Sequence, residues 1–578
     1  MKIIENEFSA RTRLANIKKL SQEEFDILII GGGITGAGVS CISQYHGLKT
    51  ALVEMNDFAS GTSSKSSKLL HGGLRYLEKL KFKLVFEALR DRNKLFKELP
   101  HISKPIPFIA PVYNFYKQNL FIINSGVTLY DFLSFISKNM LNSFHKIITK
   151  DKFNEVEPNI RKENLTGGIL YYDGYCDDAR LTIENIKTAH NLGATICNYL
   201  KVIGFKKDEN NKVNEAIVFD IISGQTFNIK AKVILNACGP WVDLVNSYSD
   251  NSYKNKLKPT KGIHIIVPKI TNDNAVFIKT IEKPIRWIFI IPYGDYSIIG
   301  TTDTEAKTKD NDYSYLDYDN YAQEDEIDYL LKTINYYYPN SKISKNDIIS
   351  SYAGWRPLIA PSENKHLSES DISREHEIFE LDNGIISIAG GKLTTYISMS
   401  KEILNYIIKN RNLKVIDKLD FPKLTCWNTN LNLKEFINSQ KILLSKKYDE
   451  NLIEYLINKY GTEFYKILSI IEISPVMREE IKNLSYNAKI IKAEIIYSVL
   501  YEMTITLKDF MIRRNRILLK DKEQGLYALD EIAEIMSFSL STILYWDNET
   551  RLNWIKKQKE DYIKEVELTN AGKKSIKK

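Results

Sequence analysis

Phe25-Asp26-Ile27-Leu28-Ile29-Ile30 runs directly into Gly31-Gly32-Gly33-Ile34-Thr35-Gly36 near the start of the chain. An apolar run that enters glycines at positions 31, 33 and 36 has the G-x-G-x-x-G spacing of a dinucleotide-binding strand, turn and helix. Gly31 permits the tight turn, Gly33 lets the backbone approach a pyrophosphate, and Gly36 lets the helix pack closely on the strand. The amides at the start of the helix then face the phosphate charge.

The residues after this stretch supply the rest of a nucleotide-binding unit. Ile34 to His46 has the pattern of a helix, and Thr50 to Val53 that of a second strand. Glu54 ends this strand about 20 residues beyond the glycines, where an acid holds a ribose hydroxyl. We therefore predict a dinucleotide-binding fold rather than a glycine-rich turn in an ordinary α/β domain.

Length and composition predict a cytosolic protein of two or three domains. The chain has 578 residues, 43% of them hydrophobic, which is too long for a single core and excludes wholesale disorder. The net charge of +8 suits an anionic substrate, an anionic membrane surface or simply a solvated exterior. Five cysteines without a C-x-x-C pair argue against a disulfide framework and a zinc site, so we expect no metal.

No segment has the pattern of a membrane span or a secretory signal. Met1 to Gln22 is polar and charged, without an apolar signal core. The most apolar stretch, Leu120 to Ile136, contains Asn124, Ser125 and Asp131. Because no uncharged apolar run reaches about 18 residues, we expect a chain that does not span a membrane but is free to lie on one.

The densest chemistry lies in residues 58–78. Small hydroxyl residues and glycines there let backbone amides crowd against a ligand. His71, Arg75 and Tyr76 add a titratable ring, a fixed cation and a phenol. We favour a ligand-binding loop over the alternative, a Ser-rich surface loop that leads into a helix over residues 81–99.

Further elements follow along the chain. Helical periodicity and β-rich runs indicate a second α/β unit, a sheet and a helical C-terminal part. The predicted helices cover residues 181–192, 452–460 and 493–516, and the predicted strands cover residues 194–199, 201–206, 216–220, 226–229, 232–237, 263–267, 287–291, 296–300 and 385–389.

Widely separated segments carry a specific resemblance to one family. In the same order over residues 5–550, the chain resembles FAD-dependent glycerol-3-phosphate dehydrogenases and the related α-glycerophosphate oxidases. The matching segments are Gly61–Glu78, Asp177–Thr182, Thr260–Ile265 with Gly300–Asp303, and Ala353–Leu358 with Ala389–Tyr396.

This resemblance implies an activity and its partners. The expected reaction oxidises sn-glycerol 3-phosphate to dihydroxyacetone phosphate, with hydride transfer from C2 to N5 of FAD. A membrane quinone is the expected electron acceptor, and the alternative is an oxidase that reduces oxygen to hydrogen peroxide. The resemblance further implies a cytoplasmic protein that associates peripherally with the inner face of the membrane, and a homodimer.

The resemblance also assigns substrate-site residues. His71 and His264 lie in matched segments and are alternative candidates for the base, because imidazole accepts an alcohol proton near neutral pH. Ile263 stands where the family usually has Ser before this histidine. The phosphate and glycerol contacts fall on Arg75, Tyr76, Arg356 and Lys392.

Cofactor contacts implied by the resemblance lie mainly in the glycine turn, the loop after Glu54 and a second glycine pair. A helix that begins near Thr394 would direct backbone amides at the flavin ring. Cys238, with no partner thiol nearby in the sequence, has the pattern of a small buried residue. The implied contacts are Gly31, Gly33, Ile34, Thr35, Gly36, Glu54, Thr62, Ser63, Ser66, Lys68, Leu69, Leu70, Val202, Ala237, Gly239, Gly391, Lys392, Leu393 and Thr394.

The expected fold class is α/β, with a two-dinucleotide-binding-type, Rossmann-like FAD domain, a mixed β-sheet substrate domain and a helical C-terminal domain. A flavin-dependent tRNA-modifying protein and a non-catalytic scaffold are the alternatives from other classes. Neither needs the string from His71 to Tyr76, so we expect no nucleic-acid partner. The expected divisions are a lead-in at 1–22, the FAD domain at 23–110, 151–250 and 350–405, the substrate domain at 111–150 and 251–349, the helical domain at 410–560, and a basic tail at 561–578.

Overall fold

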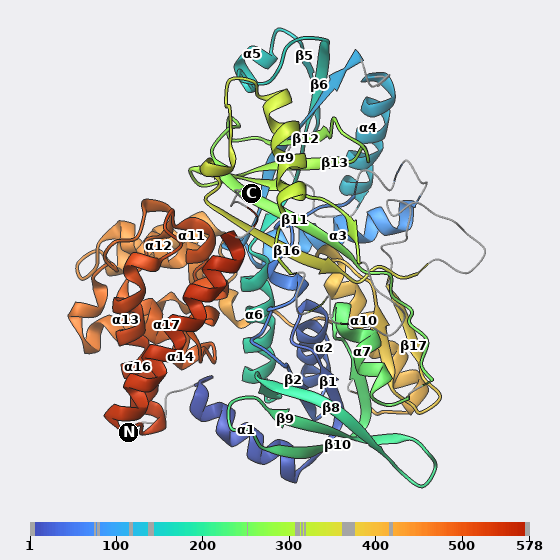
Figure 1. Cartoon of the computed structure of the whole chain (residues 1–578), viewed down its shortest axis with the longest axis vertical. Coiled ribbons are helices and arrows are strands. Elements are labelled where there is room, and N and C mark those ends of the chain that lie inside the picture. Colours follow the sequence, from blue (N-terminus) through green and yellow to red (C-terminus); the bar gives the residue numbers. More distant parts are fainter. Residues whose placement is uncertain are drawn as a thin grey trace, which may run out of the picture.

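Two β-sheets and a group of C-terminal helices make up the molecule (Figure 1). The second sheet lies at the top of the view, the first sheet below it, and the C-terminal helices at one side. The computed structural model describes residues 6–73, 77, 81–114, 120–136, 144–250, 252–306, 313, 316, 320–360, 376–415, 420–570 and 572.

The first sheet contains the predicted glycine-turn unit. Its strand order is β17-β18-β10-β1-β2-β7, and β8 and β9 extend β10 as an antiparallel meander. Alternate side chains of β1 enter two different core clusters, so both faces of the sheet are buried. The strands are β1 (Glu24–Ile30), β2 (Thr50–Val53), β7 (Thr195–Cys197), β8 (Leu200–Lys207), β9 (Val213–Asp220), β10 (Thr226–Asn236), β17 (Glu377–Glu380) and β18 (Ile386–Ala389).

Helices cover both faces of this sheet. α2 follows the glycine turn and packs between α6 and α10, whereas α1 lies against β7 and β10. The predicted helices over residues 34–46 and 181–192 are confirmed within a few residues, and α1 occupies most of the expected polar lead-in. These helices are α1 (Ala10–Gln22), α2 (Ile34–Tyr45), α6 (Asp178–Asn191), α7 (Val242–Ser247) and α10 (Tyr396–Arg411).

A single strand, β10, replaces two predicted ones. It runs unbroken over Thr226–Asn236, where separate strands over residues 226–229 and 232–237 were predicted. The first half of β10 pairs with β9 and the second half with β1. The strand therefore passes from the hairpin into the parallel sheet without a turn.

The second sheet is mixed and has ten strands. Its order is β15-β11-β14-β13-β12-β4-β6-β3, with β16 on β11 and β5 on β6. The strands are β3 (Leu69–Leu70), β4 (Ser103–Tyr113), β5 (Lys146–Thr149), β6 (Leu165–Cys176), β11 (Thr260–Pro268), β12 (Ala275–Lys279), β13 (Trp287–Tyr293), β14 (Tyr296–Gly300), β15 (Thr304–Glu305) and β16 (Ser350–Arg356). The helices of this part are α3 (Phe82–Glu98), α4 (Leu120–Ile136), α5 (Phe153–Val156) and α9 (Glu324–Tyr337).

The second sheet reaches into segments that were expected in the FAD domain. The start of β4, the whole of β6 and the whole of β16 belong to it, although residues 23–110, 151–250 and 350–405 had been assigned to the other domain. β4 pairs with β6 along its length, and β16 pairs with β11. Such pairings join residues far apart in the chain, and no change of composition marks them.

The C-terminal part is helical, as predicted, but one predicted helix is broken. α14 ends at Tyr501 instead of continuing to residue 516. Met503 donates its N–H to the carbonyl of Phe8 at 2.6 Å, and the Asp509 carboxylate accepts the amides of Ile505 and Thr506. The elements are α11 (Leu433–Leu444), α12 (Glu450–Tyr460), α13 (Phe464–Ile473), α14 (Lys492–Tyr501), a π-helix (Asp509–Arg514), α15 (Ile517–Lys520), α16 (Leu529–Leu544) and α17 (Asn548–Asn570).

The last helix extends into the expected basic tail. Tyr562 and Val566 of α17 are buried, and the Tyr562 hydroxyl donates to the carbonyl of Gln524 at 2.6 Å. Residues 561–570 are therefore helical. No helix in the described parts of the chain combines the length and the apolar character needed to cross a bilayer.

Buried ion pairs fasten the C-terminal helices to the first sheet. Asp57, which follows β2, accepts hydrogen bonds from Arg513 at 2.5 Å and Arg514 at 2.7 Å. Arg180 on α6 pairs with Glu502 beyond the end of α14. Both ends of each pair are buried, so the helical part packs on the first sheet as one continuous core.

Candidate active site

The turn between β1 and α2 has the close contacts that only glycine permits. A Cβ atom on Gly31, whose φ is +110°, would lie 2.7 Å from the carbonyl oxygen of Ala237. A Cβ on Gly36 would lie 1.9 Å from the carbonyl oxygen of Gly31. Gly33 caps α2, and the N–H of Ile34 donates to Ser63 Oγ at 2.9 Å. The tight turn predicted for Gly31 and the close helix packing predicted for Gly36 are present.

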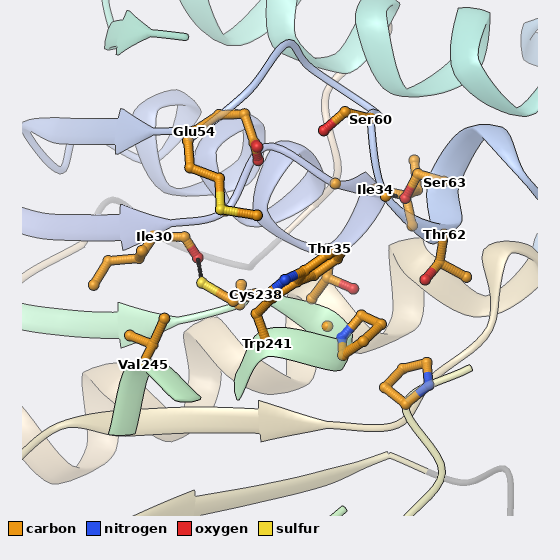
Figure 2. A pocket seen from close by; sticks show the side chains of 18 of the residues that line it. Ile30, Ile34, Thr35, Glu54, Ser60, Thr62, Ser63, Cys238, Trp241 and Val245 are labelled. Atoms are coloured by element: carbon orange, nitrogen blue, oxygen red, sulfur yellow. Dashed lines mark hydrogen bonds between the residues drawn. The ribbon is translucent and has the colours of Figure 1, made fainter. Parts of the chain in front are cut away.

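This turn opens onto a large cavity (Figure 2). The end of β1, the start of α2, the loop after β2, β8, the residues after β10 and the glycine pair after β18 all contribute to its wall. The structure thus brings together segments separated by more than three hundred positions in the chain. The predicted cofactor residues that line it are Gly31, Gly33, Ile34, Thr35, Glu54, Thr62, Ser63, Ser66, Val202, Ala237, Gly239, Gly391, Lys392 and Leu393.

Glu54 lies at one end of this cavity, directly after β2. Its carboxylate accepts the amide N–H of Gly32 at 2.6 Å and that of Asn56 at 2.9 Å. Burial raises the pKa of this carboxyl group, although both amide hydrogen bonds oppose the shift. The acid is therefore fixed beside the glycine turn, with lone pairs left to accept a hydroxyl group.

The second glycine pair also forms part of the cavity wall. Gly390 and Gly391, with φ of +76° and +102°, follow β18 and turn the chain towards Lys392. A Cβ on Gly391 would lie 2.4 Å from Met399 Cε, so this turn packs tightly on α10. Pro357, which follows β16, lines the cavity as well. The residue before it is Arg356, so a predicted substrate ligand directly precedes the cavity wall.

Five predicted cofactor residues do not line the cavity. Gly36 contributes to helix packing, as described above, and Thr394 is the middle residue of the turn Leu393–Thr395 before α10. Lys68 is buried, and its ammonium group pairs with Asp178 at 3.0 Å rather than facing the cavity. The remaining two, Leu69 and Leu70, form β3 of the second sheet.

The second sheet presents one face to the loop over residues 62–66. Ile263 and Ile265 of β11 pack towards α9, so His264, between them, points to the other face. Tyr352 of β16 pairs with His264 and stacks on it, with ring centroids 4.7 Å apart. The Tyr352 hydroxyl donates to the carbonyl of Ser66 at 2.9 Å. Ile263, the departure from the family pattern, therefore points away from this site.

Arg356 occupies the same face, four residues along β16 from Tyr352, the cross-strand partner of His264. Its guanidinium lies over Gly262, where a Cβ would be 2.4 Å from Nη2. It donates to Asp303 at 2.6 Å and to Thr301 Oγ1 at 2.8 Å. Arg286 pairs with the second oxygen of Asp303 at 3.0 Å. One carboxylate thus holds two guanidinium groups side by side.

His264 is buried and neutral. Burial, together with the nearby cations of Arg356 and Lys68, lowers its pKa well below the usual range. Nε2 shares a hydrogen bond of 2.8 Å with Ser67 Oγ, whereas Nδ1 has no partner among the described residues. An imidazole in this state carries a lone pair that can accept a proton.

The other substrate-site predictions fall near the same face. His71 contacts Phe289, with ring centroids 6.5 Å apart, and Phe289 pairs with Gly300, the cross-strand partner of His264. Both candidate bases therefore flank one row of the sheet. Arg75 and Tyr76 lie outside the described residues.

Sequence reasoning missed several residues of this region. Trp241 and Ser60 line the cavity, and Asp303 orders Arg356. Trp241 lies two residues after the predicted Gly239, and Asp303 ends a segment of the family resemblance. The sequence therefore offered a reason to consider both residues. Cys238 is half-buried, lines the cavity and donates its thiol to the carbonyl of Ile30 at 3.3 Å (Figure 2).

Comparison with known proteins agrees with this arrangement over almost the whole chain. Residues 26–397 match the FAD dependent oxidoreductase family, and residues 426–551 match the C-terminal domain of alpha-glycerophosphate oxidase. The chain belongs to the FAD-dependent glycerol-3-phosphate dehydrogenase and α-glycerophosphate oxidase family.

Individual relatives of this family include both kinds of enzyme. The aerobic glycerol-3-phosphate dehydrogenase of Staphylococcus epidermidis is 36% identical over 95% of each chain. The alpha-glycerophosphate oxidase of Streptococcus pneumoniae is 32% identical over 95% of this chain and 97% of its own. The solved structure of the Bacillus halodurans glycerol-3-phosphate dehydrogenase complexed with FAD has a TM-score of 0.75 at 28% identity, over 98% of this chain and 100% of that chain.

FAD is the cofactor of this family, and the residues present fit it. The glycine cradle leaves no room for a Cβ at Gly31 or Gly36, and residues at the start of α2 line the cavity. The fixed carboxylate of Glu54 and the Lys392 side chain, both in the cavity wall, supply the acceptor and the cation that a ribose and a reduced flavin ring require.

Proposed function

We propose that this protein oxidises sn-glycerol 3-phosphate to dihydroxyacetone phosphate and delivers the electrons to a membrane quinone. The observation that carries the proposal is that a neutral imidazole, His264, and a fixed guanidinium, Arg356, lie on the same face of the second sheet. Pro357, the residue after Arg356, lines the cavity. An alcohol that bears a phosphate needs both groups, one for its hydroxyl proton and one for its dianion.

Residues of the cavity would hold FAD in a defined direction. Gly31 to Thr35 and Glu54 would bind the adenosine diphosphate part, and Gly391 to Leu393 the flavin part. When bound, FAD supplies the acceptor for the hydride from C2 of the substrate.

The substrate site would consist of cations around the phosphate and one base at the hydroxyl. Arg356 and Lys392 would bind phosphate oxygens together with Arg75, and Tyr76 would contact the glycerol part. His264 would take the C2 hydroxyl proton at Nδ1, with Ser67 holding its other nitrogen. His71 is the alternative base.

The second part of the proposal is the choice of a quinone rather than oxygen as the electron acceptor. The names of the relatives divide between dehydrogenases and an oxidase, so resemblance supports both acceptors. Aerobic turnover with glycerol 3-phosphate tests the choice: quinone reduction with little hydrogen peroxide is expected. Stoichiometric peroxide at the same turnover rate would assign the protein to the oxidases. Glycerol without the phosphate should support neither reaction.

A quinone acceptor also requires contact with a membrane. We propose that the protein associates peripherally, through apolar side chains that α1 and the β9–β10 turn expose. Sedimentation with anionic vesicles, in low and high salt, measures this association. A homodimer is proposed from the family resemblance alone, and light scattering in solution tests it.

A further inference from the structure

A second cavity lies behind the loop that lines the FAD-type cavity. Its walls come from α1, the β9–β10 turn, β16, the π-helix and α17. Ser60 lines both cavities, and Ser64 and Lys65 line the second one, directly beside Ser63 and Ser66 of the first. The loop over residues 60–66 therefore lies between the two spaces.

The inner end of this second cavity is polar. Tyr352, which stacks on His264 and is hydrogen-bonded to Ser66, forms part of it. Lys65 packs beside Gly354, where a Cβ would lie 2.8 Å from Lys65 Cβ. The Lys65 ammonium group makes no hydrogen bond or ion pair of its own with any residue that the structure describes. Burial lowers the pKa of Lys65 to about 8.

The outer end is apolar and opens at the protein surface. Trp546 and Trp554 line it, with ring centroids 6.2 Å apart. Leu14, Ile221 and Ile222 form its rim and are 56%, 44% and 50% exposed. α1 and α16 lie next to each other at this end of the molecule (Figure 1). Exposed apolar side chains gathered at one opening mark a surface that meets something apolar.

Charged side chains of both signs lie in this wall. Lys557 on α17 is exposed, and Lys508, which is 40% exposed, pairs with Glu565 at 3.6 Å. Exposed apolar side chains around such an opening insert into a bilayer. The opening therefore suits a ligand that arrives from a membrane.

We propose that this second cavity binds the quinone that accepts the electrons, with its ring at Lys65 and its isoprenoid tail leaving between Ile221, Ile222 and the two tryptophans. This inference rests on the proposed function. The match is chemical: a quinone carbonyl oxygen needs a donor, its ring needs flat aromatic neighbours, and its tail needs an apolar exit. A neutral ligand also leaves the ion pairs around the cavity undisturbed.

The reaction balances with this acceptor. Oxidation of glycerol 3-phosphate to dihydroxyacetone phosphate releases two electrons and two protons. One quinone takes up two electrons and two protons to become one hydroquinone. Lys65, with its lowered pKa, gives a proton to the reduced carbonyl oxygen and regains one from solvent.

Binding tests the site without any turnover. The holoenzyme is titrated with decylubiquinone while tryptophan fluorescence is recorded. We expect saturable quenching that disappears for the most part in Trp546→Phe. Ile221→Glu should weaken the affinity at least tenfold. Ile203→Glu is the matched control, because Ile203 lies on the neighbouring strand β8, is also 44% exposed and does not line the cavity. Equal affinity in the two glutamate variants would overturn the inference.

Lys65→Met separates the ring site from the substrate site. We expect flavin bleaching by glycerol 3-phosphate at the wild-type rate and hydroquinone formation at least tenfold slower, with partial recovery in Lys65→Arg. Wild-type hydroquinone formation in Lys65→Met would contradict the role of this side chain. Glycerol 3-phosphate could bleach the wild-type flavin while decylubiquinone neither quenches the tryptophan fluorescence nor reoxidises the reduced flavin. In that case this inference fails and the substrate assignment stands. Absence of bleaching would instead refute the proposed function.

Discussion

The guanidinium of Arg356 lies over Gly262 and is held by Asp303 and Thr301, so its position is fixed before any substrate arrives. Each charge-assisted contact to a phosphate contributes about 1.5–3 kcal/mol. Arg356→Ala should therefore raise KM for glycerol 3-phosphate by about 10- to 150-fold, while the bound FAD keeps its absorbance. Arg411→Ala, which removes a guanidinium paired with Glu380 at 2.6 Å, should leave KM unchanged. An unchanged KM in Arg356→Ala would remove this residue from the phosphate site.

The second residue-scale prediction concerns the base. His264→Gln should slow flavin reduction by about 100- to 10,000-fold, the usual size of a general-base contribution, and His71→Gln by less than tenfold. Because burial lowers the pKa of His264, its neutral form persists as the pH falls. The wild-type rate should thus stay level from pH 8 to about 6.5 and fall only in more acid solution. If the rate of flavin reduction fell further in His71→Gln than in His264→Gln, His71 rather than His264 would be the base.

For single residues, the sequence suggested which side chains belong to the candidate site but not which residues those side chains contact. His264 and Arg356 were predicted as site residues because each lies in a distinctive segment, yet the partners that fix Arg356 were not foreseen. Asp303 is 53 positions away from Arg356 and meets it only through the pairing of β11 with β16. Lys68 was expected to contact the cofactor, but its ammonium group pairs with Asp178, which lies 110 positions further along the chain. Side-chain pairing across strands has no local signature.

The glycine turn between β1 and α2 is the element on which cofactor binding depends. Gly36→Ala would place a Cβ 1.9 Å from the carbonyl oxygen of Gly31, so the helix must move away from the strand. We expect the purified variant to fold but to lose most of its FAD absorbance. Gly126→Ala on α4 is the control, because a Cβ there meets nothing within 4 Å and alanine favours helix. Full FAD content in Gly36→Ala would contradict the role of this turn.

Elements with strong local signals were predicted well, and those decided by tertiary contacts were not. The glycine turn, the helix after it and the strand over residues 50–53 follow from spacing alone. The break at Met503 does not, because it depends on the carbonyl of Phe8, almost five hundred positions away. The sequence of residues 502–506 suits either a helix or a loop. The Asp509 carboxylate accepts the amides of Ile505 and Thr506 and so stabilises the loop.

Across the whole molecule, Asp57 joins the first sheet to the C-terminal helices. Its two oxygens accept hydrogen bonds from Arg513 and Arg514, and all three side chains are almost fully buried. Asp57→Asn should lower the free energy of unfolding by about 3 kcal/mol, the lower end for a broken buried pair, because Asp509 still pairs with Arg513 and Glu502 with Arg514. Denaturant unfolding measures the change. Asp530→Asn, which loses only an 81% exposed carboxylate, should fall within about 0.5 kcal/mol of wild type. Equal stability of both variants would contradict this role of Asp57.

Reduction of the bound flavin by glycerol 3-phosphate is the reaction that the proposed substrate and the proposed site must support. Anaerobic titration of the yellow protein with this substrate, followed by absorbance, measures it directly. We predict bleaching that is complete near one equivalent per flavin and is absent with glycerol at the same concentration. A spectrum that does not change with glycerol 3-phosphate would contradict the assignment of the substrate and of the site that Arg356 and His264 form.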